Sequence, residues 1–168
     1  MKPKLLIFLG ILLTALQLAG ASHAQDVSAQ APWARATVPG QQASGAFMTL
    51  RSKVDARLVG ASSPVAGVTE VHEMAIVDGV MRMRRVDGVR LPANEPVQLK
   101  PGGSHVMLMR LKQPLEVGTS IPLSLQIEKA DGQRETLELK AEVKPLTQRM
   151  GQGGMGHGGH MQHGGMKH

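Results

Sequence analysis

Two alternating runs around a short turn, TSIPLSLQIEK (residues 119–129) and ETLELKAEV (residues 135–143), decide the fold class of this chain. In each run apolar residues occupy every second position, which is the pattern of a β-strand with one face buried in a core. The four residues between the runs, Ala-Asp-Gly-Gln, are typical of the turn of a β-hairpin. The two runs therefore predict an antiparallel pair of strands.

The rest of the body repeats this pattern of short extended segments and turn residues. Further strands are expected over residues 29–37, 45–52, 56–61, 67–77, 80–86, 97–100 and 104–112. Asp78-Gly79 and Asp87-Gly88 each follow such a run and predict hairpin turns, because Asp and Gly tolerate positive φ. No window shows the sustained period of 3.6 that indicates a helix. About eight strands at this spacing predict an all-β chain folded as an antiparallel β-sandwich.

The first 24 residues have the composition of a cleaved secretory signal. Lys2 and Lys4 precede an almost wholly apolar run over residues 5–20, and small residues follow at 22 and 24. A retained membrane anchor fits less well, because the run is shorter than the ~20 residues that span a bilayer. The chain has no cysteine, so we expect no disulfide and no lipid anchor. Residues 25–145 then suit a single domain.

The charge of the chain invites a nucleic-acid interpretation, which the distribution of residues disfavours. The sequence pI is about 10.1, but without the signal there are 17 basic residues against 13 acidic ones, and the two signs are interleaved. Aromatic side chains that could stack on bases are almost absent: beyond residue 24 there are only Trp33 and Phe47. We therefore expect no nucleic-acid partner.

Residues 146–168 differ abruptly in composition from the body. The last 19 of them, MGQGGMGHGGHMQHGGMKH, hold eight Gly, four Met and four His, with no acidic residue and no branched aliphatic residue. Such a segment cannot bury enough apolar surface to offset the entropy of ordering it. We expect a disordered C-terminal tail.

Histidine and methionine are concentrated in a few places of the body as well. Because alternate residues of a strand share a face, three expected strands each present a row of these side chains. The rows are His72 with Met74, Met81 with Met83, and His105 with Met107 and Met109. Taken singly, each Met is more often core filler and each His more often a buried, hydrogen-bonded residue. Taken together with the tail, the rows need one explanation.

Binding of a soft metal ion supplies that explanation. Thioether sulfur favours Cu(I) and offers little to Zn²⁺, Ca²⁺ or Mg²⁺, and imidazole binds both Cu(I) and Cu(II). A blue-copper electron-transfer site needs a Cys thiolate, and this chain has none. The residues therefore favour a copper carrier over an electron-transfer protein.

The spacing of these residues resembles that of a known family. His72 is followed after ten residues by Met83, and after twenty-one more by His105-Val106-Met107. This spacing, with the surrounding segments HEM…DGVMRMRRVDG and LKPGGSHVMLMRLK, resembles the signature of the periplasmic copper chaperones of the PCu(A)C type. The resemblance covers roughly residues 30–145.

The resemblance implies a cupredoxin-like β-sandwich of the Greek-key type that binds one Cu(I) through His72, Met83, His105 and Met107. It also implies a monomeric periplasmic protein without a stable membrane anchor. Its copper would go to the binuclear copper site in subunit II of cytochrome c oxidase, with Sco-type copper proteins as co-workers. Met74 is outside the signature and is the best auxiliary candidate, whereas Met81 and Met109 suit a hydrophobic surround or a role in transfer.

The tail admits two interpretations, a solvated spacer or a second, looser copper site. The second, which we favour, has the tail capture Cu(II) or supply copper to the body. Its candidate ligands are His157, His160, Met161, His163, Met166 and His168.

Two further functions compete with a chaperone. A copper sequestration or tolerance protein would also bind Cu(I), and the tail leaves room for it. An enzyme fits poorly, because no Ser-His-acid or paired-carboxylate arrangement is evident and the Asp residues suit turns. We expect no enzymatic activity.

Five arginines flank the proposed site in sequence, and they are either a solvated face or a surface that attracts an acidic partner: Arg82, Arg84, Arg85, Arg90 and Arg110.

Overall fold

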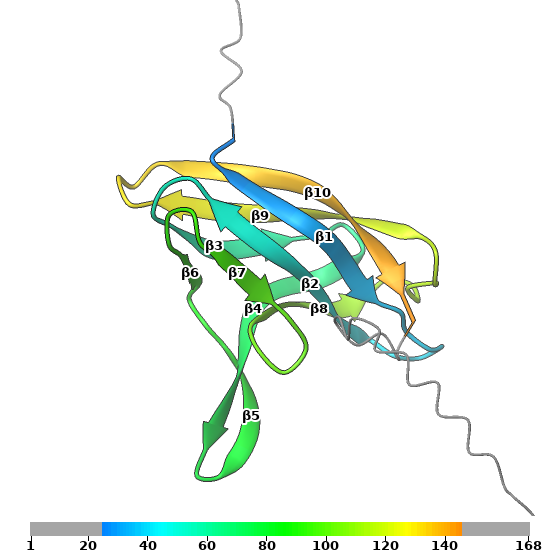
Figure 1. The fold of residues 1–168 in the computed structure, drawn as a ribbon. Coiled ribbons are helices and arrows are strands. Elements are labelled where there is room, and N and C mark those ends of the chain that lie inside the picture. The colour runs from blue at the N-terminus through cyan, green and yellow to red at the C-terminus, as the bar shows by residue number, and fades with distance from the viewer. Residues whose placement is uncertain (1–24, 146–168) are drawn as a thin grey trace, which may run out of the picture.

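The computed structural model describes residues 25–145, and within them the chain is built of ten β-strands (Figure 1). The strands are β1 (Val27–Arg35), β2 (Ala43–Ser52), β3 (Ala56–Ser62), β4 (Ala66–Val77), β5 (Val80–Arg85), β6 (Val89–Leu91), β7 (Pro96–Leu99), β8 (His105–Leu111), β9 (Ser120–Lys129) and β10 (Arg134–Lys144). No helix in these residues is long and apolar enough to span a membrane. The predicted signal (1–24) and tail (146–168) lie outside the described residues. The all-β prediction is confirmed.

The strands form one sheet in the order β5-β4-β8-β2-β1-β10-β9-β3-β6, and β7 pairs with the second half of β2. All neighbours are antiparallel except β1 and β10, which are parallel. The sheet is therefore antiparallel as predicted, except for the parallel pair of β1 and β10. The β9–β10 hairpin has the expected register, with Leu125 opposite Leu137. Its turn closes through a hydrogen bond that the Lys129 amide donates to the Gln133 carbonyl, 2.8 Å long.

The hydrophobic core lies on one face of this sheet, which folds over on itself to enclose it. Alternate residues of β2, β8, β9 and β10 are buried, as the period of two requires. In β8 Val106 and Leu108 are fully buried in the core, and Leu111 at the end of the strand also belongs to it. The side chains of His105, Met107 and Met109 therefore project from the opposite, outer face. They do not fill the core.

One of the two predicted Asp-Gly hairpins is confirmed and the other is wrong. Asp78 and Gly79 have φ values of 52° and 75°, and they join the paired residues Val77 and Val80 in a two-residue turn. Gly88 instead lies in the connection from β5 to β6, and β6 pairs with β3. A Cβ atom at Gly88 would lie 2.4 Å from the Leu58 carbonyl oxygen. Glycine is needed there because the backbone passes close to β3, and the short β6 was not predicted.

The β4–β5 hairpin extends away from the rest of the molecule (Figure 1). Pairing of β4 with β8 ends at His72, which lies opposite His105. Beyond that point β4 pairs only with β5, so residues 73–84 form a two-stranded ribbon. We call this segment the ribbon. Every residue of β5 is exposed.

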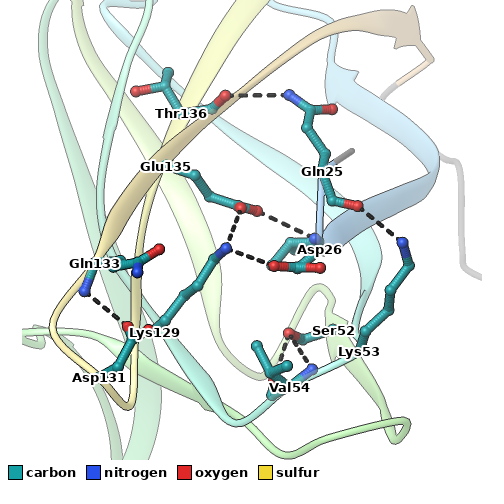
Figure 2. Close-up of polar contacts among 11 residues, drawn as sticks. Gln25, Asp26, Ser52, Lys53, Val54, Lys129, Asp131, Gln133, Glu135 and Thr136 are labelled. Atoms are coloured by element: carbon teal, nitrogen blue, oxygen red, sulfur yellow. Dashed lines mark hydrogen bonds and ion pairs between the residues drawn. The ribbon is translucent and has the colours of Figure 1, made fainter. Parts of the chain in front are cut away.

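A polar network holds the start of β1 to the β9–β10 hairpin (Figure 2). Lys129 Nζ lies 2.5 Å from Asp26 Oδ2 and 3.3 Å from Glu135 Oε2. Glu135 Oε1 also accepts a hydrogen bond from the Val27 amide, 3.1 Å long. The hydrogen bond from Lys129 is the main cause that lowers the pKa of Asp26, and the same contact raises the pKa of Lys129. This network lies at the beginning of β1, whereas the histidines lie near its end.

Candidate metal centre

The centre of the predicted site is a contact between His105 on β8 and Met83 on β5. His105 Nε2 lies 3.2 Å from Met83 Sδ. On the other side of the ring, Nδ1 lies 2.9 Å from the Gly103 carbonyl oxygen, to which it donates its proton. Burial is the main cause that lowers the pKa of His105, and the positive charges of His72 and Arg35 act in the same direction. The ring is therefore neutral at neutral pH, and its Nε2 lone pair faces the thioether.

His72 lies directly opposite His105 on the neighbouring strand β4. The centroids of the two imidazole rings are 6.1 Å apart. His72 Nε2 lies 2.8 Å from Glu70 Oε2, and this hydrogen bond is the main cause that lowers the pKa of Glu70. His72 Nδ1 is buried and has no hydrogen-bond partner within residues 25–145. A buried nitrogen without a partner is costly, so Nδ1 is the atom of this ring that is free to bind a ligand.

A pocket of about 350 Å³ opens beside the two histidines. Three of the four predicted body ligands line it: Met83, His105 and Met107. The fourth, His72, is not part of the lining, and its ring centroid lies 6.1 Å from that of His105. Met107 lies opposite Gly45 of β2, where a Cβ atom would lie 2.7 Å from Phe47 Cζ, so the glycine leaves room for the Phe47 ring beside the pocket. Met74, the predicted auxiliary ligand, also lines the pocket and lies directly opposite Met83.

The other methionines of these rows lie outside the pocket lining. Met81 is opposite Ile76 on the ribbon and is 55% exposed. Met109 pairs with Ala43 and Val68, one step further along the outer face. The predicted tail ligands lie outside the described residues.

Two aromatic residues form a wall beside His105 that the sequence-based reasoning missed. The rings of Trp33 and Phe47 have centroids 4.5 Å apart, and Phe47 lies 6.0 Å from His105. Both side chains are buried although they lie apart from the main core cluster. The Arg35 guanidinium lies 5.7 Å from the Phe47 centroid. The signal was available, since these are the only aromatic residues after the predicted signal and both belong to predicted strands.

Glu70 was also missed, although it stands two residues before His72 and therefore on the same face of the strand. It contacts both His72 and Arg85, with Oε1 at 3.4 Å from Arg85 Nη1. Carboxylates that accept a hydrogen bond from a ligating histidine orient the ring and fix its tautomer. Glu70 can therefore hold His72 so that Nδ1 stays free.

The donor set of the pocket suits a soft cation. Within residues 25–145 no group of three His, Cys, Asp or Glu side chains is arranged to hold a metal ion. The thioethers of Met74, Met83 and Met107 line the pocket beside His105, and methionine sulfur selects soft ions such as Cu(I).

The fold and the outer-face Met/His pocket define a class of small all-β domains, and comparison with known proteins names it. The model of the family described as "Putative lipoprotein LpqE-like" matches residues 27–143. The chain belongs to this LpqE-like family, and its structural neighbours are PCuAC domains.

Three individual similarities support this assignment. "Putative lipoprotein Lxx21020" of Leifsonia xyli subsp. xyli is 35% identical over 105 residues, which are 62% of this chain and 63% of that protein. The solution structure of CuI-DR1885 from Deinococcus radiodurans is 36% identical, with a TM-score of 0.55 over 77% of this chain and 85% of that one. The copper-bound PCuAC domain from PmoF2 is 25% identical, with a TM-score of 0.58 over 72% of this chain and 94% of that one.

Proposed function

We propose that this protein is a copper chaperone that binds one Cu(I) ion through His72, Met83, His105 and Met107. The observation that carries the proposal is the contact of His105 Nε2 with Met83 Sδ. In this contact the imidazole lone pair and the thioether sulfur are so close that, after small side-chain rotations, one cation could bind to both atoms. Met107 lines the same pocket, and His72 Nδ1 is a buried ring nitrogen without a hydrogen-bond partner in the described part of the chain.

The similar structures support copper as the cargo. One is a copper-bound PCuAC domain and another is a Cu(I) form. The protein would act as a carrier without enzymatic activity, since thioether ligands stabilise Cu(I) and oppose redox cycling.

Release of the ion follows from where the four ligands stand. His72 on β4 and Met107 on β8 are paired with a neighbouring strand on both sides, and His105 is paired with His72 on one side. Met83 stands on the two-stranded ribbon, and such ribbons are only marginally stable by themselves. Movement of the ribbon would remove one ligand and leave the other three in place. A copper acceptor could then enter from the side that Met83 vacates.

The acceptor that we propose is the binuclear copper site of cytochrome c oxidase subunit II, with Sco-type copper proteins as co-workers. The predicted signal over residues 1–24 would send the protein to the periplasm. Export is also consistent with the description of the Leifsonia relative as a lipoprotein.

X-ray absorption of the Cu(I)-loaded protein truncated after Pro145 tests the ligand set. Mixed nitrogen and sulfur scattering is expected, and it should lose sulfur when Met83 and Met107 are both replaced by Leu. Unchanged sulfur scattering in that variant would exclude these ligands. Mixing the loaded protein with a copper-free subunit II domain tests delivery, and no transfer would contradict the chaperone proposal.

Copper sequestration is the second candidate, and the His/Met content of residues 146–168 is the observation that favours it. We propose that this segment takes Cu(II) through some of its four His and four Met residues. Titration of the full chain and of the truncated chain with Cu(II) tests this. An equal number of bound ions in both proteins would exclude a tail site.

A further inference from the structure

One charged side chain lines the pocket that contains the candidate copper ligands. Arg35, at the end of β1, is the only charged residue of the lining in the described part of the chain, because the ring of His105 is neutral at neutral pH. No carboxylate within residues 25–145 forms an ion pair with Arg35. Its Nε atom is buried and has no hydrogen-bond partner there. Because buried charged groups are usually paired, an unpaired arginine beside a cation site requires an explanation.

Strand register places Arg35 on the same face of the sheet as the candidate ligands. Trp33 of β1 pairs with Phe47 of β2. Arg35 and Gly45 each lie two residues further along these strands, and Gly45 pairs with Met107 of β8. Alternate residues of a strand share a face, and so do cross-strand partners. The Arg35 side chain therefore projects from the outer face, as that of Met107 does.

A β-bulge in β1 turns Arg35 to this face. Just before Trp33, β1 contains one residue more than the facing segment of β2, and Ala31 in the bulge has a φ of 47°. Val27 belongs to the core before the bulge and Ala34 after it, so the buried face passes from odd-numbered to even-numbered residues. Without the extra residue Arg35 would point into the core. Positive φ is uncommon outside glycine, and bulges are frequent where a side chain is re-aimed beside a functional site.

The guanidinium of Arg35 is close enough for its charge to act on the candidate ligands. Arg35 Cζ lies 5.7 Å from the centroid of the Phe47 ring, and that centroid lies 6.0 Å from the centroid of His105. Burial is the main cause that lowers the pKa of His105, and the charge of Arg35 is one of the smaller causes. A charge that disfavours the imidazolium also disfavours a metal cation at the same place. Coulomb repulsion is proportional to charge, so it is twice as large for Cu(II) as for Cu(I).

The carboxylate that contacts a candidate ligand does not cancel this charge. Glu70 forms a hydrogen bond with His72 but does not line the pocket. Its own negative charge is opposed by Arg85, whose Nη1 lies 3.4 Å from Glu70 Oε1. The pocket itself therefore combines neutral ligands with one positive side chain.

We propose that Arg35 is a specificity-determining residue of the copper site, and that its fixed positive charge makes the pocket favour Cu(I) over Cu(II). This inference rests on the proposed function and adds a second basis of selection. The thioethers select an ion by its softness, whereas Arg35 selects it by its charge. Loss of the Arg35 charge should therefore stabilise bound Cu(II) more than bound Cu(I).

The test measures the reduction potential of the bound copper in the full-length chain. The four histidines of residues 146–168 are replaced by Gln in every sample, so that Cu(II) stays in the body. Arg35→Gln removes the charge and Arg35→Lys keeps it, while Arg134→Gln removes a charge at the distant start of β10. In Arg35→Gln we expect the affinity for Cu(II), relative to that for Cu(I), to rise about tenfold, which lowers the potential by about 59 mV. Arg35→Lys and Arg134→Gln should keep the potential of the unsubstituted body.

The remaining outcomes separate a charge effect from a packing effect. Arg35→Met is a second neutral variant, whose apolar side chain can still pack on Phe47, and it should lower the potential as Arg35→Gln does. Ag(I) is monovalent, so its affinity should change by the same factor as that of Cu(I), and unequal factors would overturn the inference.

An unchanged potential in both neutral variants would overturn the role of Arg35 and leave the proposed function in place. An equal fall in Arg35→Lys would assign the effect to contact with Phe47 and would also overturn it. Failure of the unsubstituted body to bind Cu(I) would overturn both the inference and the proposed function.

Discussion

His105 Nε2 and Met83 Sδ lie 3.2 Å apart, although their strands, β8 and β5, are separated by β4. Adjacent strands are about 4.8 Å apart, so the two backbones are separated by roughly twice that distance. Only long side chains that project from the same face can meet across an intervening strand. A long, unbranched side chain such as methionine is therefore needed at position 83. The four candidate ligands come from three strands, β4, β5 and β8, and none of them comes from a loop.

Replacement of Met83 by Leu should weaken Cu(I) binding by at least about tenfold, or ~1.4 kcal/mol. Leucine keeps most of the apolar volume but lacks the sulfur. Met109→Leu is the matched control, because Met109 lies on the same outer face outside the pocket lining. Competition with a chromophoric Cu(I) chelator measures both affinities. Equal losses in the two variants would show that Met83 is not a specific ligand.

Glu70→Leu should reduce copper affinity by roughly 10- to 100-fold, as is typical when the partner of a ligating histidine is removed. The cause is loss of the hydrogen bond that orients His72. Glu73→Leu is the control, since Glu73 lies on the other face of β4 and contacts Arg84. Glu70→Gln, which retains an oxygen acceptor, should recover part of the affinity. A loss of equal size in Glu73→Leu would indicate a general charge effect.

The pKa of His105 is lowered mainly by burial, so its ring should titrate below the usual value of about 6.5. Protonation competes with metal binding, and the affinity for Cu(I) should therefore persist at a pH where an ordinary imidazole is mostly charged. NMR titration of the His105 ring in the metal-free protein gives the midpoint. A midpoint at or above 6.5 would contradict this prediction.

Acid should destabilise the end of the domain that carries Asp26. The folded-state pKa of this residue lies below the ordinary value of about 3.9, so its contribution is present above that pH. It is lost as the pH falls through the folded-state pKa, when Asp26 binds a proton and the ion pair with Lys129 breaks. Lys129→Met should lower the thermal midpoint at pH 7 and flatten its dependence on pH between about 5 and 2. Lys140→Met, a surface lysine of β10, should change neither.

Much of the strand pattern could be predicted from the sequence, because each strand shows its buried face as an alternation of local residues. Asp78-Gly79 likewise predicts its own hairpin, since both φ values that the turn needs are properties of those two residues. Asp87-Gly88 shows the limit of such reasoning. The same dipeptide there connects two strands that do not pair, because Gly88 must pass close to Leu58 of a distant strand.

The sequence by itself determined which residues share a strand face, and so grouped His72 with Met74 and His105 with Met107. Only the tertiary structure decided that these rows lie on the outer face of the sandwich, since alternation does not say which side of a sheet becomes the core. It also decided that Phe47 lies beside His105 and that Met83 stands on a ribbon beyond the paired sheet. Those relations depend on which strands become neighbours, and strand order results from packing of the whole chain.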